Sequence, residues 1–290
     1  MKILITGATG FIGSNLVKFL SEGNNLYCLT RSEINLPEGN NVKWIRQDLS
    51  DDLSYSRLPK NLDVIIHLAQ SRHYKEFPKE VFDIFDINVR STLTLLEYGR
   101  KVGIKKIILA SSGGIYGYSY EKFAESSIIT PVNFYLSSKY CAELLTANYK
   151  DYFSTVVFRL FFVYGEGQKN MLFPRLIESI KNDQPISIYG KEGVKINPIY
   201  IRDVVKTFKS ALDYSVKGIF NIGGDEEISI KALAELIGKS IGKKPKFTYQ
   251  QTAYPGDILG DNSKMKAILK VSPEINLKEG IKRMLEFEEC

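Results

Sequence analysis

A glycine-rich turn directly behind the first predicted strand restricts the possible folds more than any other feature of the chain. The predicted strand Lys2–Thr6 is followed at once by glycines at positions 7, 10 and 13, and a helix is predicted over Ile12–Leu20. In this order the first glycine permits a tight turn, the second lets the backbone approach a pyrophosphate, and the third lets helix and strand pack closely. The helix N-terminus offers free N–H groups and a positive dipole to phosphates. The pattern predicts a dinucleotide-binding turn formed by Gly7, Gly10, Phe11, Ile12 and Gly13.

Apolar runs typical of strands alternate with helical patterns through the first half of the chain, which indicates βαβ units and a parallel sheet. We therefore predict an α/β fold: a Rossmann-type doubly wound parallel sheet with a smaller α/β C-terminal substrate lobe. Apolar side chains at three- and four-residue steps also predict one buried stripe on a long helix, formed by Phe82, Phe85, Val89, Leu93 and Leu96. The predicted strands are Lys2–Thr6, Asn25–Thr30, Val42–Ile45, Asp63–His67, Lys106–Ala110, Thr155–Leu160 and Gly218–Ile222.

The rhythm of the sequence changes after Gly165, where glycines and prolines separate shorter segments. Residues 1–165 are predicted to form the NAD(P)-binding Rossmann domain, and residues 197–222 to return to it. The substrate-binding lobe is predicted to comprise residues 166–196 and 223–290. Helical spacing reappears in this lobe around Leu233 and Ile237, and again around Ile281.

Composition excludes several classes of protein. The chain has 290 residues, and its 39 basic side chains exceed its 33 acidic ones by only six, so the charge does not indicate a nucleic-acid partner. We find no apolar run long enough for a membrane span and no signal peptide at the start, and we predict a cytoplasmic protein without a membrane partner. Three scattered cysteines and two histidines fit neither a disulfide framework nor a metal site.

The end of the second predicted strand bears on the choice of cofactor. An acidic residue there binds the ribose 2′-hydroxyl of NAD, whereas an arginine accommodates the 2′-phosphate of NADP. Arg31 lies at the expected distance from Gly7, and Ser32 follows it with a hydroxyl group. These two residues favour NADP(H). Glu33 is the acidic alternative and would favour NAD.

A second constellation combines Tyr135 and Lys139, in the pattern YxxxK, with Ser112 upstream. Residues four apart on a helix share a face, so the phenol and the ammonium group can enter one cleft. A phenol with a pKa near 10 is a poor base at neutral pH, and a neighbouring ammonium group lowers that pKa. The spacing therefore suits a proton relay between a tyrosine and a lysine.

Taken together, these motifs make the chain resemble extended short-chain dehydrogenases/reductases of the NAD(P)-dependent epimerase/dehydratase family, from Lys2 to about Phe287. The resemblance implies that Tyr135 is the general acid/base, that Lys139 binds the nicotinamide ribose and lowers the tyrosine pKa, and that Ser112 holds the reacting oxygen. It also implies a homodimer formed through two long helices around 82–99 and 135–149. Further cofactor contacts are implied for Asp48, Leu49, Leu68, Ala69 and Gln70, and further family motifs lie at 88–92, 111–117, 159–165 and 220–224.

Members of this family act mostly on nucleotide-activated sugars, so a nucleotide sugar is the expected small-molecule partner. Gly113 and Gly114 stand where 4,6-dehydratases carry an Asp-Glu pair, which argues against dehydration. Family 4-epimerases normally hold NAD tightly, whereas Arg31 favours NADPH. A reductase that exchanges its cofactor at every turnover fits this preference, so the expected reaction is the reduction of a 4-keto nucleotide sugar. The alternatives are a 4-epimerase with tightly bound NAD and, from another class, a non-catalytic NADP-binding regulatory protein.

The sequence departs from the family at the positions expected to bind the substrate diphosphate. Phe162 replaces an asparagine commonly found near the diphosphate, and Ile196 and Asn197 stand where a phosphate-binding arginine often occurs. A diphosphate needs cationic partners or backbone donors. Arg175, Lys191, Lys195 and Arg202 are the candidate replacement cations. The predicted substrate contacts are Ser112, Phe162, Arg175 and Asn197. Some family members reduce lipophilic ketones or aldehydes, which carry no diphosphate and need no cationic partner. A substrate of this class is the alternative to a nucleotide sugar.

Overall fold

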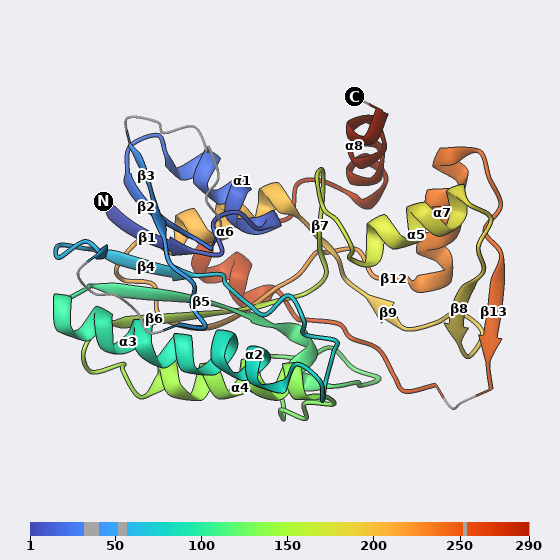
Figure 1. The fold of residues 1–290 in the computed structure, drawn as a ribbon. Coiled ribbons are helices and arrows are strands. Elements are labelled where there is room, and N and C mark those ends of the chain that lie inside the picture. The colour runs from blue at the N-terminus through green and yellow to red at the C-terminus, as the bar shows by residue number, and fades with distance from the viewer. Residues whose placement is uncertain (32–40, 52–56, 252–253, 290) are drawn as a thin grey trace. The chain divides into compact units, whose positions relative to one another are not determined.

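The structure is a computed structural model that describes residues 1–31, 41–51, 57–251 and 254–289, the side chains of 288 and 289 excepted. The chain forms two compact units (Figure 1). Unit 1 comprises residues 1–115, 130–159 and 205–220, and unit 2 comprises residues 116–129, 160–204 and 221–290. The assignment of cofactor binding to residues 1–165 and 197–222, and of substrate binding to the remainder, stays a prediction.

A seven-stranded sheet forms the centre of unit 1, in the order β11-β6-β5-β4-β1-β2-β3. The strand β1 lies between β2 and β4 and is parallel to both, with Ile5 opposite Cys28 and Ile66. The order of the strands therefore reverses beside β1, and in such sheets ligands bind at the carboxyl ends of the strands on either side of that point. The predicted fold class is confirmed. The strands are β1 (Lys2–Thr6), β2 (Asn25–Thr30), β3 (Val42–Arg46), β4 (Val64–His67), β5 (Lys106–Ser112), β6 (Ser154–Leu160) and β11 (Gly218–Ile222).

Helices cover both faces of this sheet. In Figure 1, α3 and α4 lie side by side along one face, and α1 lies on the other. The first face is held by a buried apolar cluster in which Leu4 and Ile65 of the sheet pack with Leu95 and Leu96 of α3. Burial of such side chains contributes about 1.5–3 kcal/mol each. The helices are α1 (Phe11–Leu20), α2 (Val81–Phe85), α3 (Ser91–Val102), α4 (Phe134–Ala147) and α6 (Ile201–Ser210).

The prediction of one buried stripe along residues 82–96 is wrong. Val89 and Leu96 are buried, but Phe82 is 80% exposed, and Phe85 and Leu93 are also exposed. A π-helical turn at Asp86–Arg90, between α2 and α3, separates Phe82 and Phe85 from the later residues of the stripe. A wider turn rotates the residues before it by about 100° relative to those after it, so a spacing counted across it does not describe one face.

A buried lysine of the sheet anchors the segment 205–220. Lys106 begins β5, and its fully buried ammonium group donates to the carbonyl oxygens of Ala211, Asp213 and Val216, the first and the last at 2.7 Å. Three acceptors match the three donors of an ammonium group. These hydrogen bonds hold the loop between α6 and β11 against the N-terminal end of β5.

The described residues of unit 2 form short strands and the long helices α5, α7 and α8. The pair β8 (Ile186–Tyr189) and β13 (Phe247–Gln250) is parallel, and α7 packs against α5 and α8. Ser229 caps α7, because its hydroxyl oxygen accepts the Ala232 N–H at 3.1 Å. The remaining elements are β7 (Val163–Tyr164), β9 (Lys195–Ile196), β10 (Ile199–Tyr200), β12 (Ile228–Ser229), α5 (Leu172–Lys181), α7 (Ile230–Ile241) and α8 (Leu277–Glu289).

Candidate functional site

The glycine turn after β1 has the tight geometry that a bound dinucleotide requires. Gly7 has a left-handed backbone with φ of +66°, and a Cβ atom on it would lie 2.8 Å from the Ala69 nitrogen. A Cβ atom on Gly13 would lie 2.1 Å from the Gly7 oxygen, so a side chain there would separate α1 from the turn. Gly10 precedes α1 and has no side chain that could cap the first N–H groups of this helix. The residues therefore fit a pyrophosphate at this helix N-terminus.

A buried histidine supports the turn from β4. The Thr6 hydroxyl lies 2.6 Å from His67 Nδ1, and His67 Nε2 lies 3.1 Å from the Thr92 hydroxyl. Thr92 donates its own proton to the Asn88 carbonyl at 2.7 Å, so it accepts from Nε2–H and Thr6 donates to Nδ1. Burial, together with the charge of Lys139, lowers the pKa of His67 to about 3. The ring is neutral and holds the ends of β1 and β4 at a fixed separation.

The predicted catalytic tyrosine lies at the start of α4. Asn133 caps this helix, because its side-chain oxygen accepts the Leu136 N–H at 2.9 Å. Tyr135 therefore projects from the first turn, where its hydroxyl donates to Gln70 Oε1 at 2.8 Å. Its ring centroid lies 5.1 Å from that of Tyr74. Burial raises the pKa of Tyr135, and the phenol of Tyr74 adds to this effect.

Lys139 lies one helical turn after Tyr135 and is 4% exposed. Burial lowers the pKa of its ammonium group to about 8, and the carboxylate of Glu143 opposes that shift. Tyr135, Lys139 and Glu143 thus share one stripe of α4. The predicted pair and the loop that follows β4 meet in the same part of unit 1.

Ser112 ends β5, and its hydroxyl oxygen accepts the Gly114 N–H at 3.2 Å. A Cβ atom on Gly114 would lie 3.0 Å from the Leu136 side chain of α4. Residue 114 therefore has to be small for the turn after Ser112 to approach the helix that carries Tyr135. No contact between the Ser112 and Tyr135 side chains is observed among the described residues.

The predicted adenine side of the site lies at the ends of β2 and β3. Arg31 is exposed immediately after β2, and Ser32 lies outside the described residues. Asp48 accepts the Ser50 N–H at 3.0 Å and the Ser50 hydroxyl at 2.8 Å, which fixes the turn after β3. Leu49 is buried in the core of unit 1. Their roles in cofactor binding stay predictions.

Sequence reasoning missed the side chains that hold the site together. Asn88 lies in a family motif and is expected to order this region, and the structure adds its partners: its side-chain oxygen accepts the Ser71 N–H and its NH₂ group donates to the Ser138 hydroxyl. Arg159 of β6 forms a buried ion pair with Glu143. Only the Asn133 cap had a local signal, since a polar residue often precedes a helix. The other contacts join residues distant in sequence.

The three predicted substrate residues outside unit 1 have different surroundings. Asn197 is buried, and its amide bonds the backbone of Gly224 and Gly260 at 2.8–3.1 Å. Phe162 has a left-handed backbone, with φ of +46°, which is unfavourable for a bulky residue. Arg175 is exposed on α5. Within the described residues, no group of three His, Cys, Asp or Glu side chains could hold a metal ion.

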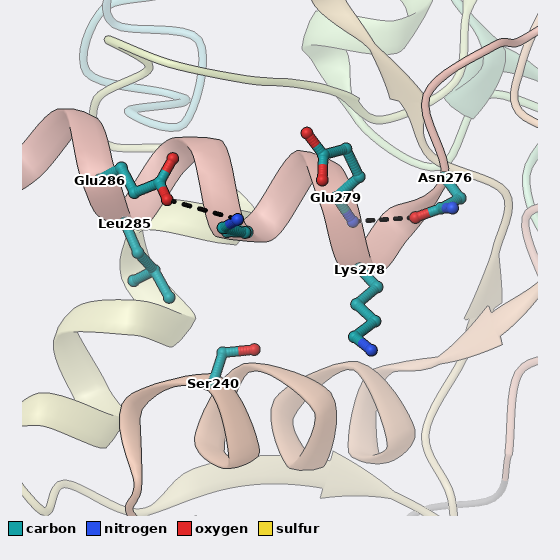
Figure 2. Close-up of a pocket in the computed structure, with 7 residues that line it drawn as sticks. Ser240, Asn276, Lys278, Glu279, Leu285 and Glu286 are labelled. Atoms are coloured by element: carbon teal, nitrogen blue, oxygen red, sulfur yellow. Dashed lines mark hydrogen bonds and ion pairs between the residues drawn. The ribbon is translucent and has the colours of Figure 1, made fainter.

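A groove of about 610 Å³ lies elsewhere in unit 2, between α7 and α8 (Figure 2). Lys278 of α8 and Ser240 of α7 lie on its two sides, while Asn276 caps α8 by accepting the Glu279 N–H at 2.8 Å. None of the predicted site residues that the structure describes lines it. No helix in the described parts of the chain combines the length and apolar character needed to cross a membrane.

Comparison with known proteins decides the family. The profile of the NAD dependent epimerase/dehydratase family matches residues 3–223. The chain belongs to this family. It is 31% identical to a UDP-glucuronate 4-epimerase of Thermodesulfobacterium geofontis, over 98% of this chain and 95% of that one. It is 29% identical to a dTDP-4-dehydro-6-deoxyglucose reductase of Escherichia coli, with 99% and 98% covered.

Among solved structures, UDP-glucuronic acid 4-epimerase from Bacillus cereus, in complex with UDP-glucuronic acid and NAD, superposes with a TM-score of 0.89 at 26% identity. The alignment covers 100% of this chain and 99% of that one. The family member described here is accordingly an NAD(P)-dependent enzyme of the short-chain dehydrogenase/reductase type. Two of these three proteins are 4-epimerases and the third is a 4-dehydro sugar reductase, so the comparisons favour the 4-epimerase alternative over the 4-ketoreductase.

Proposed function

We propose that this chain is a nucleotide-sugar 4-epimerase that acts on a UDP-sugar with bound NAD. The observation that carries the proposal is the contact of Tyr135 with the loop after β4, which also packs on the glycine turn. Lys139 lies one helical turn after Tyr135 on α4. A proton-transfer pair beside a dinucleotide turn suits oxidation of a hydroxyl group and its reversal. The likeness to a solved 4-epimerase with NAD supports the choice of reaction.

Tyr135 takes the proton of the sugar 4-hydroxyl and later returns it to the same oxygen. Lys139 stabilises the phenolate form of Tyr135 through its positive charge. Ser112 donates a hydrogen bond to the reacting oxygen and orients it. A bound nicotinamide supplies the hydride acceptor and donor. Epimerisation leaves no net oxidation of the sugar, so one tyrosine serves both proton transfers.

NAD replaces NADP(H) as the proposed cofactor, since the solved 4-epimerase contains NAD. The sequence favoured NADP(H) on the strength of Arg31 and Ser32. Denaturing the purified protein and identifying the released nicotinamide tests the choice. Stoichiometric NAD supports it, whereas an empty protein that prefers NADPH at least tenfold favours the reductase.

We further propose that the enzyme is a homodimer. The neighbouring helices α2, α3 and α4 expose the large apolar side chains Phe82, Phe85, Leu93 and Leu144. Apolar side chains gathered on one exposed face are typical of an interface. A second copy of this chain, applied through the same helices, would bury them.

The reaction is tested without added cofactor. The purified protein is incubated separately with UDP-glucose and UDP-glucuronic acid, and the products are separated by anion-exchange chromatography. We expect the 4-epimer of at least one sugar, and no product from a Tyr135→Phe variant. Consumption of NADPH with a 4-keto nucleotide sugar, without epimer formation from either UDP-sugar, would overturn the proposal in favour of the ketoreductase.

A further inference from the structure

The hydroxyl of Tyr135 bonds an amide side chain that the sequence associated with the cofactor. Tyr135 Oη donates to Gln70 Oε1 at 2.8 Å. Gln70 is exposed and lies in the loop after β4, whereas Tyr135 begins α4. The pair is 65 residues apart in sequence, so the contact depends on the fold and not on local geometry.

A ring of hydrogen bonds fixes the two partners relative to each other. Ser71, next to Gln70, donates its N–H to Asn88 Oδ1 at 3.0 Å. The Asn88 amide donates to the Ser138 hydroxyl at 2.8 Å, and Ser138 donates to the Tyr135 carbonyl at 2.7 Å. Asn88 and Ser138 are both buried, which protects these bonds from water.

The other side of Gln70 is fixed as well. Leu68 N–H donates to the Thr6 carbonyl, and Ala69 N–H donates to the Thr6 hydroxyl, each at 3.2 Å. The backbone is therefore bonded to β1 before Gln70 and to the π-helical turn after it. The side chain of Gln70 is exposed, and the hydrogen bonds named above hold the backbone on both sides of it.

A glutamine amide suits both protonation states of a phenol. Its oxygen accepts the O–H of the neutral form, and its NH₂ group donates to the ionised form. The last side-chain torsion of glutamine is broad and roughly two-fold, so the exchange needs only a rotation. Among the described titratable groups, Tyr74 from the loop after β4 acts on Tyr135. Lys139 follows one helical turn later on α4, where its charge acts on His67 and is opposed by Glu143.

We propose that Gln70 is a positioning residue for the proton of Tyr135, accepting from the phenol and, after rotation of its amide, donating to the phenolate. The inference rests on the proposed function, in which Tyr135 takes a proton from the sugar hydroxyl and returns it. The amide itself neither gains nor loses a proton. It keeps the phenolate hydrogen-bonded during the interval in which the proton resides elsewhere.

The first test titrates Tyr135 directly in the NAD-bound enzyme by NMR, with its resonance assigned through the Tyr135→Phe variant. A Gln70→Glu variant places a carboxylate beside the phenol, and we expect it to raise the Tyr135 pKa by about one unit or more. Gln70→Leu removes the donor and raises that pKa by a smaller amount. Gln184→Glu, which adds the same charge at an exposed position of unit 2, leaves it unchanged.

The second test measures the pH profile of kcat/KM for epimerisation. We expect the acidic limb to move to higher pH in Gln70→Glu, and kcat/KM near neutral pH to fall about three- to tenfold in Gln70→Leu. An unchanged Tyr135 pKa and an unchanged profile in both variants would overturn the proposal. Shifted titration without any epimerase activity would support Gln70 and reject the proposed function instead.

Discussion

Arg159 and Glu143 form a buried ion pair, with Arg159 Nη2 2.7 Å from Glu143 Oε2 and each side chain 3% exposed. Arg159 Nε also contacts both carboxylate oxygens, at 3.2 Å. The pair links β6 to α4 one helical turn beyond Lys139. A charged pair removed from water is stable only while both members are present.

Replacing one member of this pair should therefore cost much of the stability of the fold. In Arg159→Met the Glu143 carboxylate stays buried without its partner, and we expect the free energy of unfolding to fall by about 3–5 kcal/mol. Urea denaturation monitored by circular dichroism measures the loss. The double variant Arg159→Met/Glu143→Leu is the control, because an apolar pair restores most of the stability. Equal losses in the single and double variants would contradict this account.

His67 predicts a pH dependence of stability. Its pKa in the folded protein is about 3, below the ordinary value near 6.5, so between these values the unfolded chain binds more protons. Its contribution is complete above pH 6.5 and is lost as the pH falls towards 3. The slope reaches at most about 1.4 kcal/mol per pH unit for one proton. Unfolding free energies of the wild type and His67→Gln across this window should differ in slope, and parallel curves would refute the assignment.

Ser112 allows a test of the proposed orientation of the reacting oxygen. Ser112→Ala removes the hydroxyl donor, and we expect kcat to fall on the order of 10²-fold while the protein stays folded. Ser112→Thr keeps a hydroxyl group that can still accept the Gly114 N–H, and it should retain most of the activity. The comparison is made under saturating nucleotide sugar. Similar rates for Ser112→Ala and the wild type would remove Ser112 from the proposed mechanism.

The strands and the glycine turn were predictable because they are local patterns. Apolar runs such as Lys2–Thr6 can satisfy their backbone only within a sheet, and the structure places strands there with the predicted bounds or within two residues of them. The spacing of Tyr135 and Lys139 likewise needs nothing beyond one helix. The predictions of the fold class and of the family rest on these local features.

Contacts between distant segments were not predictable in the same way. No pattern around Arg159 indicates a partner 16 residues earlier, and none around Gln70 indicates Tyr135. The π-helical turn at Asp86–Arg90 also has no local signal, and it separates Phe82 and Phe85 from the rest of the predicted stripe. Periodicity identifies apolar side chains without saying whether the chain itself or another copy covers them.

The exposed apolar face gives a test of the proposed dimer. Phe82, at 80% exposed, and Phe85 lie on α2, and Leu144 lies on α4. We expect Phe82→Asp/Phe85→Asp to weaken self-association by at least tenfold, since charges replace apolar contacts at the interface. Sedimentation velocity over a range of concentrations measures the change. The control, Phe287→Asp, alters another exposed phenylalanine outside these helices and should leave the dimer intact. A wild-type protein that sediments as a monomer at all concentrations would reject the dimer and leave this apolar face for a different partner.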